Sequence, residues 1–266
     1  MRLYRAVLLR SFQSNTAYRA ETVMKFFFSL LQILIQTSIW IALYGRDNVH
    51  SSSVGDVSLR EMLTYTILGI CVQIVVGNDI IWRLGSKIQS GEIASDLIKP
   101  IPFARFMFAE SGGQTLFRIV FEMVPIVAFG FFAYGLLFPS AADLGLFLLC
   151  LLNGIALYYL MSFIVGLFAF WYMVYWHSGS LFHVVMSLFS GSMLPLWFFP
   201  ESFIRVAQFL PFQLVFYGPI SVFVGKTTFL ETLRLVGMQF VWIAILSFGL
   251  KWVWSKAWRK LVIQGG

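Results

Sequence analysis

Few residues in this sequence have the types and spacing that catalysis, metal binding or phosphate binding requires. The stretch Gly225-Lys226-Thr227-Thr228 ends like a phosphate-binding loop, but that motif needs a glycine at the position of Ile220. The three histidines lie far apart, with no second ligand at metal-site spacing, and no strained, glycine-flanked serine marks a nucleophile. We therefore expect no catalytic residue, and no metal or cofactor bound by this chain, which has no ATPase motif of its own.

The longest stretch that cannot lie in lipid runs from Arg83 to Glu110, between two strongly apolar segments. Within it, GEIASDLIKPIPF predicts a short amphipathic helix that ends at a pair of prolines, because proline lacks an N–H and restricts the preceding residue. The residues expected to dock on a soluble partner are Glu92, Ile93, Asp96, Leu97 and Lys99. The alternative is a solvated loop between two membrane spans.

The composition is that of an integral membrane protein. Of 266 residues, 59% are hydrophobic and 12% are charged, whereas soluble domains carry roughly 25% charged residues. The net charge of +7 does not indicate nucleic acid as a partner, because the basic residues sit at the ends of apolar segments rather than on one face. Cys71 and Cys150 both lie within apolar segments, so we expect no disulfide.

Six apolar segments reach the roughly 20 residues that a span needs. They cover residues 24–44, 62–82, 119–138, 144–171, 181–199 and 235–254. Backbone groups in lipid must be satisfied within each span, so the predicted class is an all-α integral membrane protein with six transmembrane helices. Residues 1–23 are interrupted by arginines too often for a cleavable signal, and they predict an in-plane helix at the membrane surface.

Six spans place both termini on one side of the membrane. With the N-terminus inside, fourteen of the 19 lysines and arginines fall on the inner side, so the positive-inside rule predicts cytoplasmic termini and a cytoplasmic segment 83–115. Four prolines break the stretch before the last span into pieces too short to cross, and residues 200–232 therefore predict re-entrant helices on the outer face. An apolar surface loop is the alternative.

Ionisable and polar groups inside the spans are candidates for function. Asp79 with Arg83, and Arg118 with Glu122, are four residues apart, so each pair can form within one helix and neutralise itself there. Polar residues also follow one face of the first and second spans. Those that we expect to line a transport path are Gln32, Gln36, Thr66 and Gln73; packing between helices is the alternative for each stripe.

The order of these features resembles the permease subunits of bacterial type-2 ABC transporters, a family of small six-span permeases. The resemblance covers essentially the whole chain, 1–266, as a single permease domain. It rests on the N-terminal in-plane helix, on SGEIASDLIKPI between the second and third spans, and on the proline-punctuated LPLWFFPESFIRVAQFLPFQLVFYGPI before the last span. In that family, the segment after the second span is the coupling helix, which here falls on residues 91–99.

The resemblance implies a dimer of permeases in the bacterial inner membrane, made of two copies or of two homologous chains. Two separate cytosolic ATPase subunits, which bind ATP and Mg²⁺, would drive export through the coupling helix. The competing class is a channel or proton-coupled carrier that works without an ATPase. That class predicts a buried acid without a nearby partner, or internal repeats in the two halves.

Overall fold

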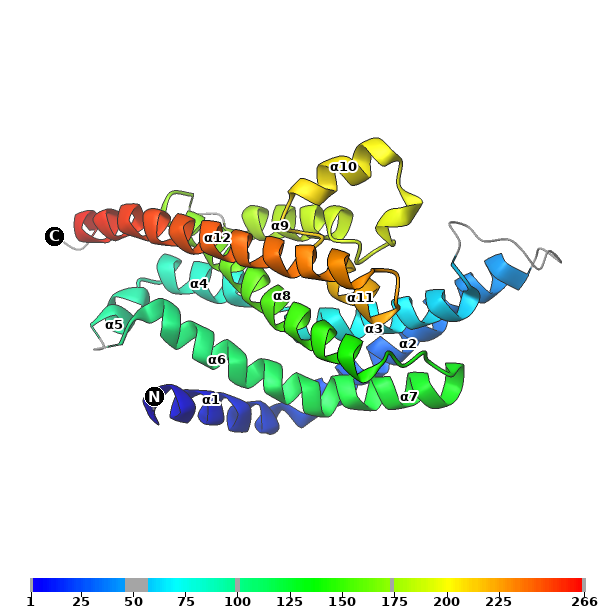
Figure 1. Cartoon of the computed structure of the whole chain (residues 1–266). Coiled ribbons are helices and arrows are strands. Elements are labelled where there is room, and N and C mark those ends of the chain that lie inside the picture. Colours follow the sequence, from blue (N-terminus) through cyan, green and yellow to red (C-terminus); the bar gives the residue numbers. More distant parts are fainter. Residues whose placement is uncertain (1, 46–56, 99–100, 173–174, 265–266) are drawn as a thin grey trace.

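The computed structural model describes residues 2–45, 57–98, 101–172 and 175–264, and within these ranges all regular structure is helical. The long helices run roughly side by side along one axis (Figure 1). Both chain termini lie at the end of the bundle that carries α5, and the C-terminal end of α2 lies at the opposite end (Figure 1). The all-helical class predicted from the sequence is confirmed.

The helices follow one another with short connections. In chain order they are α1 (Arg2–Asn15), η1 (Thr16–Tyr18), α2 (Arg19–Gly45), α3 (Leu59–Val76), α4 (Ile80–Gln89), α5 (Ile93–Leu97), α6 (Phe103–Arg118), η2 (Ile119–Met123), α7 (Val124–Tyr134), α8 (Ala141–Leu167), η3 (Phe168–Phe170), α9 (Tyr175–Phe189), η4 (Leu196–Phe198), α10 (Glu201–Phe209), α11 (Tyr217–Phe223) and α12 (Phe229–Gln264).

Five helices of the described chain are long and apolar enough to cross a membrane. They cover Ala20–Tyr44, Leu59–Gln89, Phe103–Tyr134, Ala141–Phe170 and Phe229–Ala257. The predicted span at 181–199 is not one continuous helix. Its helix α9 ends at Phe189, and Gly191 follows with φ +77°, a left-handed conformation that turns the chain. The third span also begins earlier than predicted, because α6 runs without interruption from Phe103 into α7 through η2.

The second span is broken between α3 and α4. Gly77 leaves the helical conformation with ψ 130°, and α4 begins three residues later. The exposed backbone groups find partners locally. The amide of Gly77 donates to the Gln73 carbonyl, Asn78 Oδ1 accepts from the amide of Ile80, and the Arg118 guanidinium donates to the Gly77 carbonyl. The amides of Gly77 and Ile80 and the carbonyl of Gly77 are therefore paired at the break, as backbone groups at membrane depth must be.

The core is built around α8, which packs against α12, α4, α11, α9 and α3. The largest buried cluster joins apolar side chains of α3, α8, α9, α11 and α12. A second cluster lies at the end of the bundle near α5 and includes Ile80, Ile93, Met107 and Phe163. Lipid does not reward burial of apolar side chains as water does, so close packing and buried hydrogen bonds hold such a bundle together.

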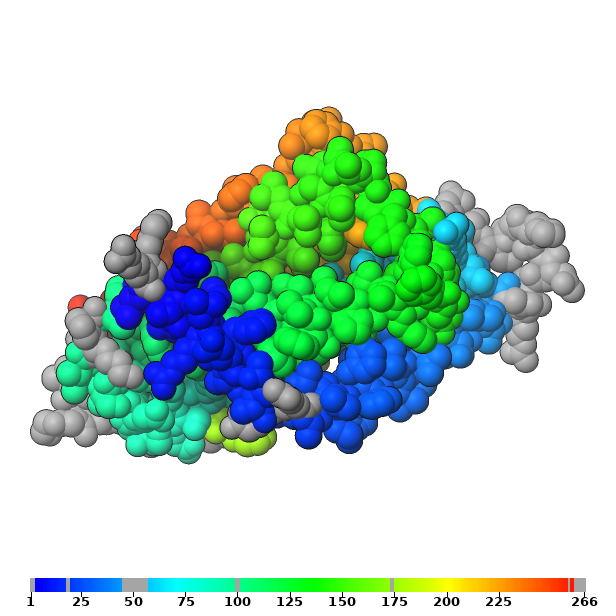
Figure 2. Space-filling view, turned by 90° about the horizontal axis from the view of Figure 1, so that it is seen from below, coloured from blue at the N-terminus to red at the C-terminus, as the bar shows by residue number. Residues whose placement is uncertain are grey.

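The first helix packs along α6. Ser11 Oγ donates to the Glu110 carbonyl over 2.7 Å, and Phe12 and Phe117 meet edge-on with ring centroids 5.7 Å apart. Gly113 permits this approach, because a Cβ placed there would lie 2.3 Å from the Leu8 carbonyl oxygen. In Figure 2, α1 (dark blue) lies on the outside of the molecule.

The segment before the last span forms two helices of different character. α10 has one buried residue, Ala207, whereas the six residues of α11 from Gly218 to Phe223 are all buried. α11 packs against α8 and α3. The stretch that ends like a phosphate loop is the turn after α11: Lys226 pairs with Glu61 at 3.0 Å, and Thr228 and Glu231 exchange hydrogen bonds at the start of α12. These contacts give the stretch a structural explanation.

Candidate functional site: a braced short helix and a polar groove

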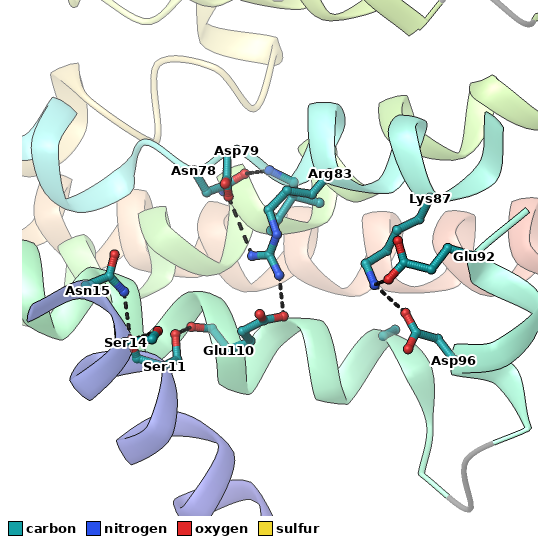
Figure 3. Close-up of polar contacts among 12 residues, drawn as sticks. Ser11, Ser14, Asn15, Asn78, Asp79, Arg83, Lys87, Glu92, Asp96 and Glu110 are labelled. Carbon is teal, nitrogen blue, oxygen red and sulfur yellow. Dashed lines mark hydrogen bonds and ion pairs between the residues drawn. The ribbon is translucent and has the colours of Figure 1, made fainter. Parts of the chain in front are cut away.

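The short helix α5 is attached to the end of α4 by one lysine. Lys87 Nζ donates to Glu92 Oε1 over 2.9 Å and to Asp96 Oδ2 over 2.5 Å (Figure 3). Lys87 therefore joins both acidic residues that precede or lie within α5. A positive charge between two carboxylates forms charge-assisted bonds, which are stronger than neutral ones. We call the two ion pairs of Lys87 with Glu92 and Asp96 the brace. The brace fixes α5 to α4, the helix that continues the second span.

The predicted docking residues separate into buried and exposed members. Ile93 is 1% exposed and Asp96 6% exposed, so both face the protein rather than a partner. Ile98 is 84% exposed, Glu92 is exposed and Leu97 is half-buried. Lys99 lies outside the described residues. The surface that α5 offers to another molecule is therefore formed by Glu92, Ala94, Ser95 and Ile98, whereas Ile93 and Asp96 hold the helix in place.

The pair Asp79 and Arg83 forms as predicted and has a third member. Arg83 Nη1 lies 3.6 Å from Asp79 Oδ1, and Arg83 Nη2 also pairs with Glu110 on α6 (Figure 3). Sequence spacing does not indicate Glu110 as a partner of Arg83, because the two residues are 27 positions apart and lie on different helices. The guanidinium thus connects the start of α4 to α6, beside the point where Ser11 of α1 meets the Glu110 carbonyl.

The predicted pair between Arg118 and Glu122 is wrong. No ion pair joins the two side chains in this part of the described structure, and Arg118 donates instead to the Gly77 carbonyl. The reason is local: residues Ile119–Met123 form a π-turn, in which the wider winding takes residues four apart out of register. Glu122 is 6% exposed and lines a hollow with Lys25, Gln32 and Gln73.

All four residues predicted to line a path meet in one groove. Gln32 and Gln36 on α2 face Thr66 and Gln73 on α3 across a hollow of about 340 Å³. Its other walls are largely apolar or aromatic and include Trp40, Leu43, Met62, Tyr65, Met193 and Leu194. The two polar stripes therefore face a common space instead of packing against each other.

Two further hollows adjoin this groove through shared residues. A hollow of about 360 Å³ shares Gln73 and Ser192 with it, and continues to Asn78, Asp79 and His183. A hollow of about 420 Å³ shares Gln32, Ile70 and Gln73, and continues to Lys25, Arg118 and Glu122. Gln73 lines all three, so a continuous band of polar side chains connects the groove to the charged residues near the α3–α4 break.

The structure gives no indication of a metal centre. Within the described residues, no three His, Cys, Asp or Glu side chains are grouped closely enough to hold a metal ion. His177 and His183 are exposed on α9, and His50 lies outside the described residues. Cys71 and Cys150 are free and buried.

Long apolar helices, a short helix fastened to one end and a polar groove define a membrane protein of the transport-permease class. A family model described as ABC-2 family transporter protein matches residues 30–265. The chain belongs to this family, the membrane component of type-2 ABC transporters, which is not itself the ATPase. Among curated proteins, none matches the chain.

Proposed function

We propose that this chain is the membrane-spanning subunit of an ATP-driven exporter, coupled through α5 to a separate cytosolic ATPase. The observation that carries the proposal is the double ion pair of Lys87 with Glu92 and Asp96. It makes α5 a stiff extension of the second span, with Ile98 and Ser95 exposed at its tip. A push on the tip would therefore move α4 with it.

The brace acts together with the packing beneath it. Ile93 is buried in the cluster that includes Ile80 and Leu84 of α4, Met107 of α6 and Phe163 of α8. Arg83 joins the same two helices, α4 and α6, through Asp79 and Glu110. A displacement of α5 would therefore move α4, α6 and α8 together. Such a joint movement can convert a small shift into a change between two packed states.

The topology that we propose has six crossings: the five long apolar helices and α9, which would be the fifth crossing along the chain. Basic residues gather at the end of the bundle with α5 and both termini, so this end would face the cytoplasm of the bacterial inner membrane. In this arrangement α1 would lie in the membrane surface beside α6. α10 and α11 would enter the outer face without crossing, which is tolerated because α11 is buried in protein.

The groove between α2 and α3 would be one wall of the translocation path in a dimer, with a second copy or a homologous permease supplying the other wall. Gln32, Gln36, Thr66 and Gln73 would offer hydrogen bonds to polar parts of a substrate. Trp40 and Leu43 would contact its apolar parts. ATP and Mg²⁺ would bind only to the partner ATPase.

The test is co-purification with the cognate ATPase, followed by measurement of substrate-stimulated hydrolysis and transport. Charge reversal at Glu92 removes one arm of the brace at the exposed edge of α5, so we expect Glu92→Lys to insert normally while losing at least half of the stimulation. Glu201→Lys on α10 is the matched control, since Glu201 is also exposed but lies far along the chain from α5. Unchanged stimulation in Glu92→Lys would contradict the proposed coupling.

One observation favours a second candidate, a proton-coupled carrier. Glu122 is buried, has no ion-pair partner within the described residues and lines a hollow in the membrane region. A carrier of this kind would move substrate in response to a proton gradient without any ATPase. Transport that persists with a hydrolysis-deficient ATPase and disappears in Glu122→Gln would favour this candidate over the exporter.

A further inference from the structure

A pocket opens at the end of the bundle that carries α5, between the start of α6 and the C-terminal halves of α8 and α12. Its volume is about 500 Å³, and its residues come from positions 102–108, 156–163 and 247–254. It shares no lining residue with the polar groove between α2 and α3. The pocket is therefore separate from the proposed transport path.

Aromatic rings form most of the inner wall. Phe103 and Trp254 stack with ring centroids 5.8 Å apart, and Phe163 lies 6.2 Å from each of these two rings. Phe108 meets Tyr159 edge-on at 4.8 Å, and the Tyr159 hydroxyl is held by the Ala104 carbonyl at 2.6 Å. These contacts fix the wall, so the pocket is a preformed apolar slot rather than a gap that side chains can close.

Two basic residues stand at the pocket on different helices. Arg105 of α6 and Lys251 of α12 both line it, and both are exposed. Neither has an ion-pair or hydrogen-bond partner in the part of the chain that the structure describes. This contrasts with Arg83 and Lys87 nearby, which are neutralised by acidic side chains. No acidic residue lines the pocket to offset the two charges.

We propose that this pocket binds an anionic phospholipid. The headgroup phosphate would pair with Arg105 and Lys251, and one acyl chain would lie in the slot against Phe103, Phe163 and Trp254. Unpaired cations above an apolar slot between membrane helices match the two halves of such a lipid. A free inorganic anion could pair only with the two basic residues. A lipid without net charge could fill only the apolar slot.

A lipid bound here would connect α6 with α12 at the end of the bundle where α5 joins α6. It would stabilise one arrangement of these helices. The proposal does not depend on the transport function, because lipid binding can be measured on the isolated permease.

The experiment uses the full-length chain in a neutral detergent, with phosphatidylglycerol carrying brominated acyl chains as the probe. Bromine quenches tryptophan on contact, and Trp254 lines the slot, so binding is read as the quenching that is lost in Trp254→Phe. We expect brominated phosphatidylglycerol to bind at least ten-fold more tightly than brominated phosphatidylcholine. Inorganic phosphate at millimolar concentration should not displace it.

Removal of both charges in R105Q/K251Q should weaken binding about 30-fold, since each basic residue near an anionic headgroup contributes about five-fold. The matched control is R10Q/K256Q, which makes the same charge change at two exposed residues, one of them also on α12, that do not line the pocket. Its affinity should stay within two-fold of the unaltered chain. Ala156→Phe fills the slot without changing charge, and it should also abolish Trp254 quenching.

Three results would overturn the proposal. The first is equal weakening in R105Q/K251Q and R10Q/K256Q, which would indicate general attraction to the surface. The second is equal binding of the two phospholipids, and the third is displacement by inorganic phosphate, which would make this a simple anion site. Each altered chain must show the same unfolding temperature as the unaltered chain without lipid, so that lost binding is not lost folding.

Discussion

Asn153 on α8 and Gln239 on α12 form a buried side-chain hydrogen bond, with 3.1 Å between Asn153 Nδ2 and Gln239 Oε1. Gln239 is fully buried, and its Nε2 also donates to the carbonyls of Cys150 and Leu214, each over 2.9 Å. One side chain thus connects the last span to the central helix and to the chain just before α11. In a bundle without a strong hydrophobic driving force, such bonds help to fix which faces meet.

We predict that Gln239→Leu destabilises the protein by about 2 kcal/mol, from three lost bonds of about 0.6 kcal/mol each. Asn153 is 8% exposed, and its side-chain amide would lose the bond to Gln239. Denaturant titration of the purified chain, followed by tryptophan fluorescence, measures the change. Gln208→Leu on exposed α10 is the control, and a loss as large in Gln208→Leu as in Gln239→Leu would argue against the specific network.

Adjacent glycines on α6 give a matched pair for the contact with α1. A Cβ at Gly113 would lie 2.3 Å from the Leu8 carbonyl oxygen, whereas a Cβ at Gly112 would be 3.7 Å from the Leu8 side chain, an ordinary contact. Gly113→Ala should therefore force α1 from α6 and cost about 1–3 kcal/mol. Gly112→Ala should cost little. Protease cleavage after the arginines of α1 is the measurement, and equal cleavage rates in the two variants would refute the close contact.

The sequence predicted the helical class and most of the spans, because continuous apolar runs have one structural solution in lipid. The prediction of one continuous span over residues 181–199 was wrong. Hydropathy does not detect that Gly191 takes a left-handed conformation, or that the Gly191 carbonyl accepts from the Tyr65 hydroxyl at 2.8 Å. The end of α9 is set by a contact with α3, 126 residues earlier in the chain.

The site residues show the same limit. The four polar residues of the groove could be chosen from helical spacing alone, since polar side chains in spans avoid lipid. The burial of Asp96 could not be predicted in this way, because Lys87, which forms an ion pair with it, lies on another helix nine residues away. The pair Arg118–Glu122 was predicted from i,i+4 spacing, which holds in an α-helix and not in the π-turn found there.

The brace between α4 and α5 can be tested by exchanging its charges. Lys87→Asp removes the ion pair with Asp96 and places a second carboxylate beside it, so we expect a loss of about 1.5–3 kcal/mol in unfolding free energy. Asp96→Lys alone should have a similar effect. The double variant K87D/D96K restores an ion pair with reversed polarity, so it should recover at least half of the stability and of the ATPase stimulation.

The control for this exchange is the pair of Lys226 and Glu61, which joins the turn after α11 to α3. Lys226→Asp should reduce the stability of the permease. In the complexes that still form, substrate should stimulate ATP hydrolysis as it does with the unaltered chain. If the double exchange at 87 and 96 recovers stability without any recovery of stimulation, the brace is structural and α5 does not transmit force.

The groove between α2 and α3 makes a prediction about transport itself. Gln36 and Gln73 line the same hollow from opposite helices, and neither side-chain amide makes a hydrogen bond within the described residues. Their amides are available to a substrate, so Gln36→Ala and Gln73→Ala should each reduce transport several-fold with no change in stability. The double variant should lose more than either one if both contact the same bound molecule. Gln208→Ala, on exposed α10, should transport normally. Transport assays in inverted vesicles distinguish these outcomes, and full activity in the double variant with every substrate tested would remove the groove from the path.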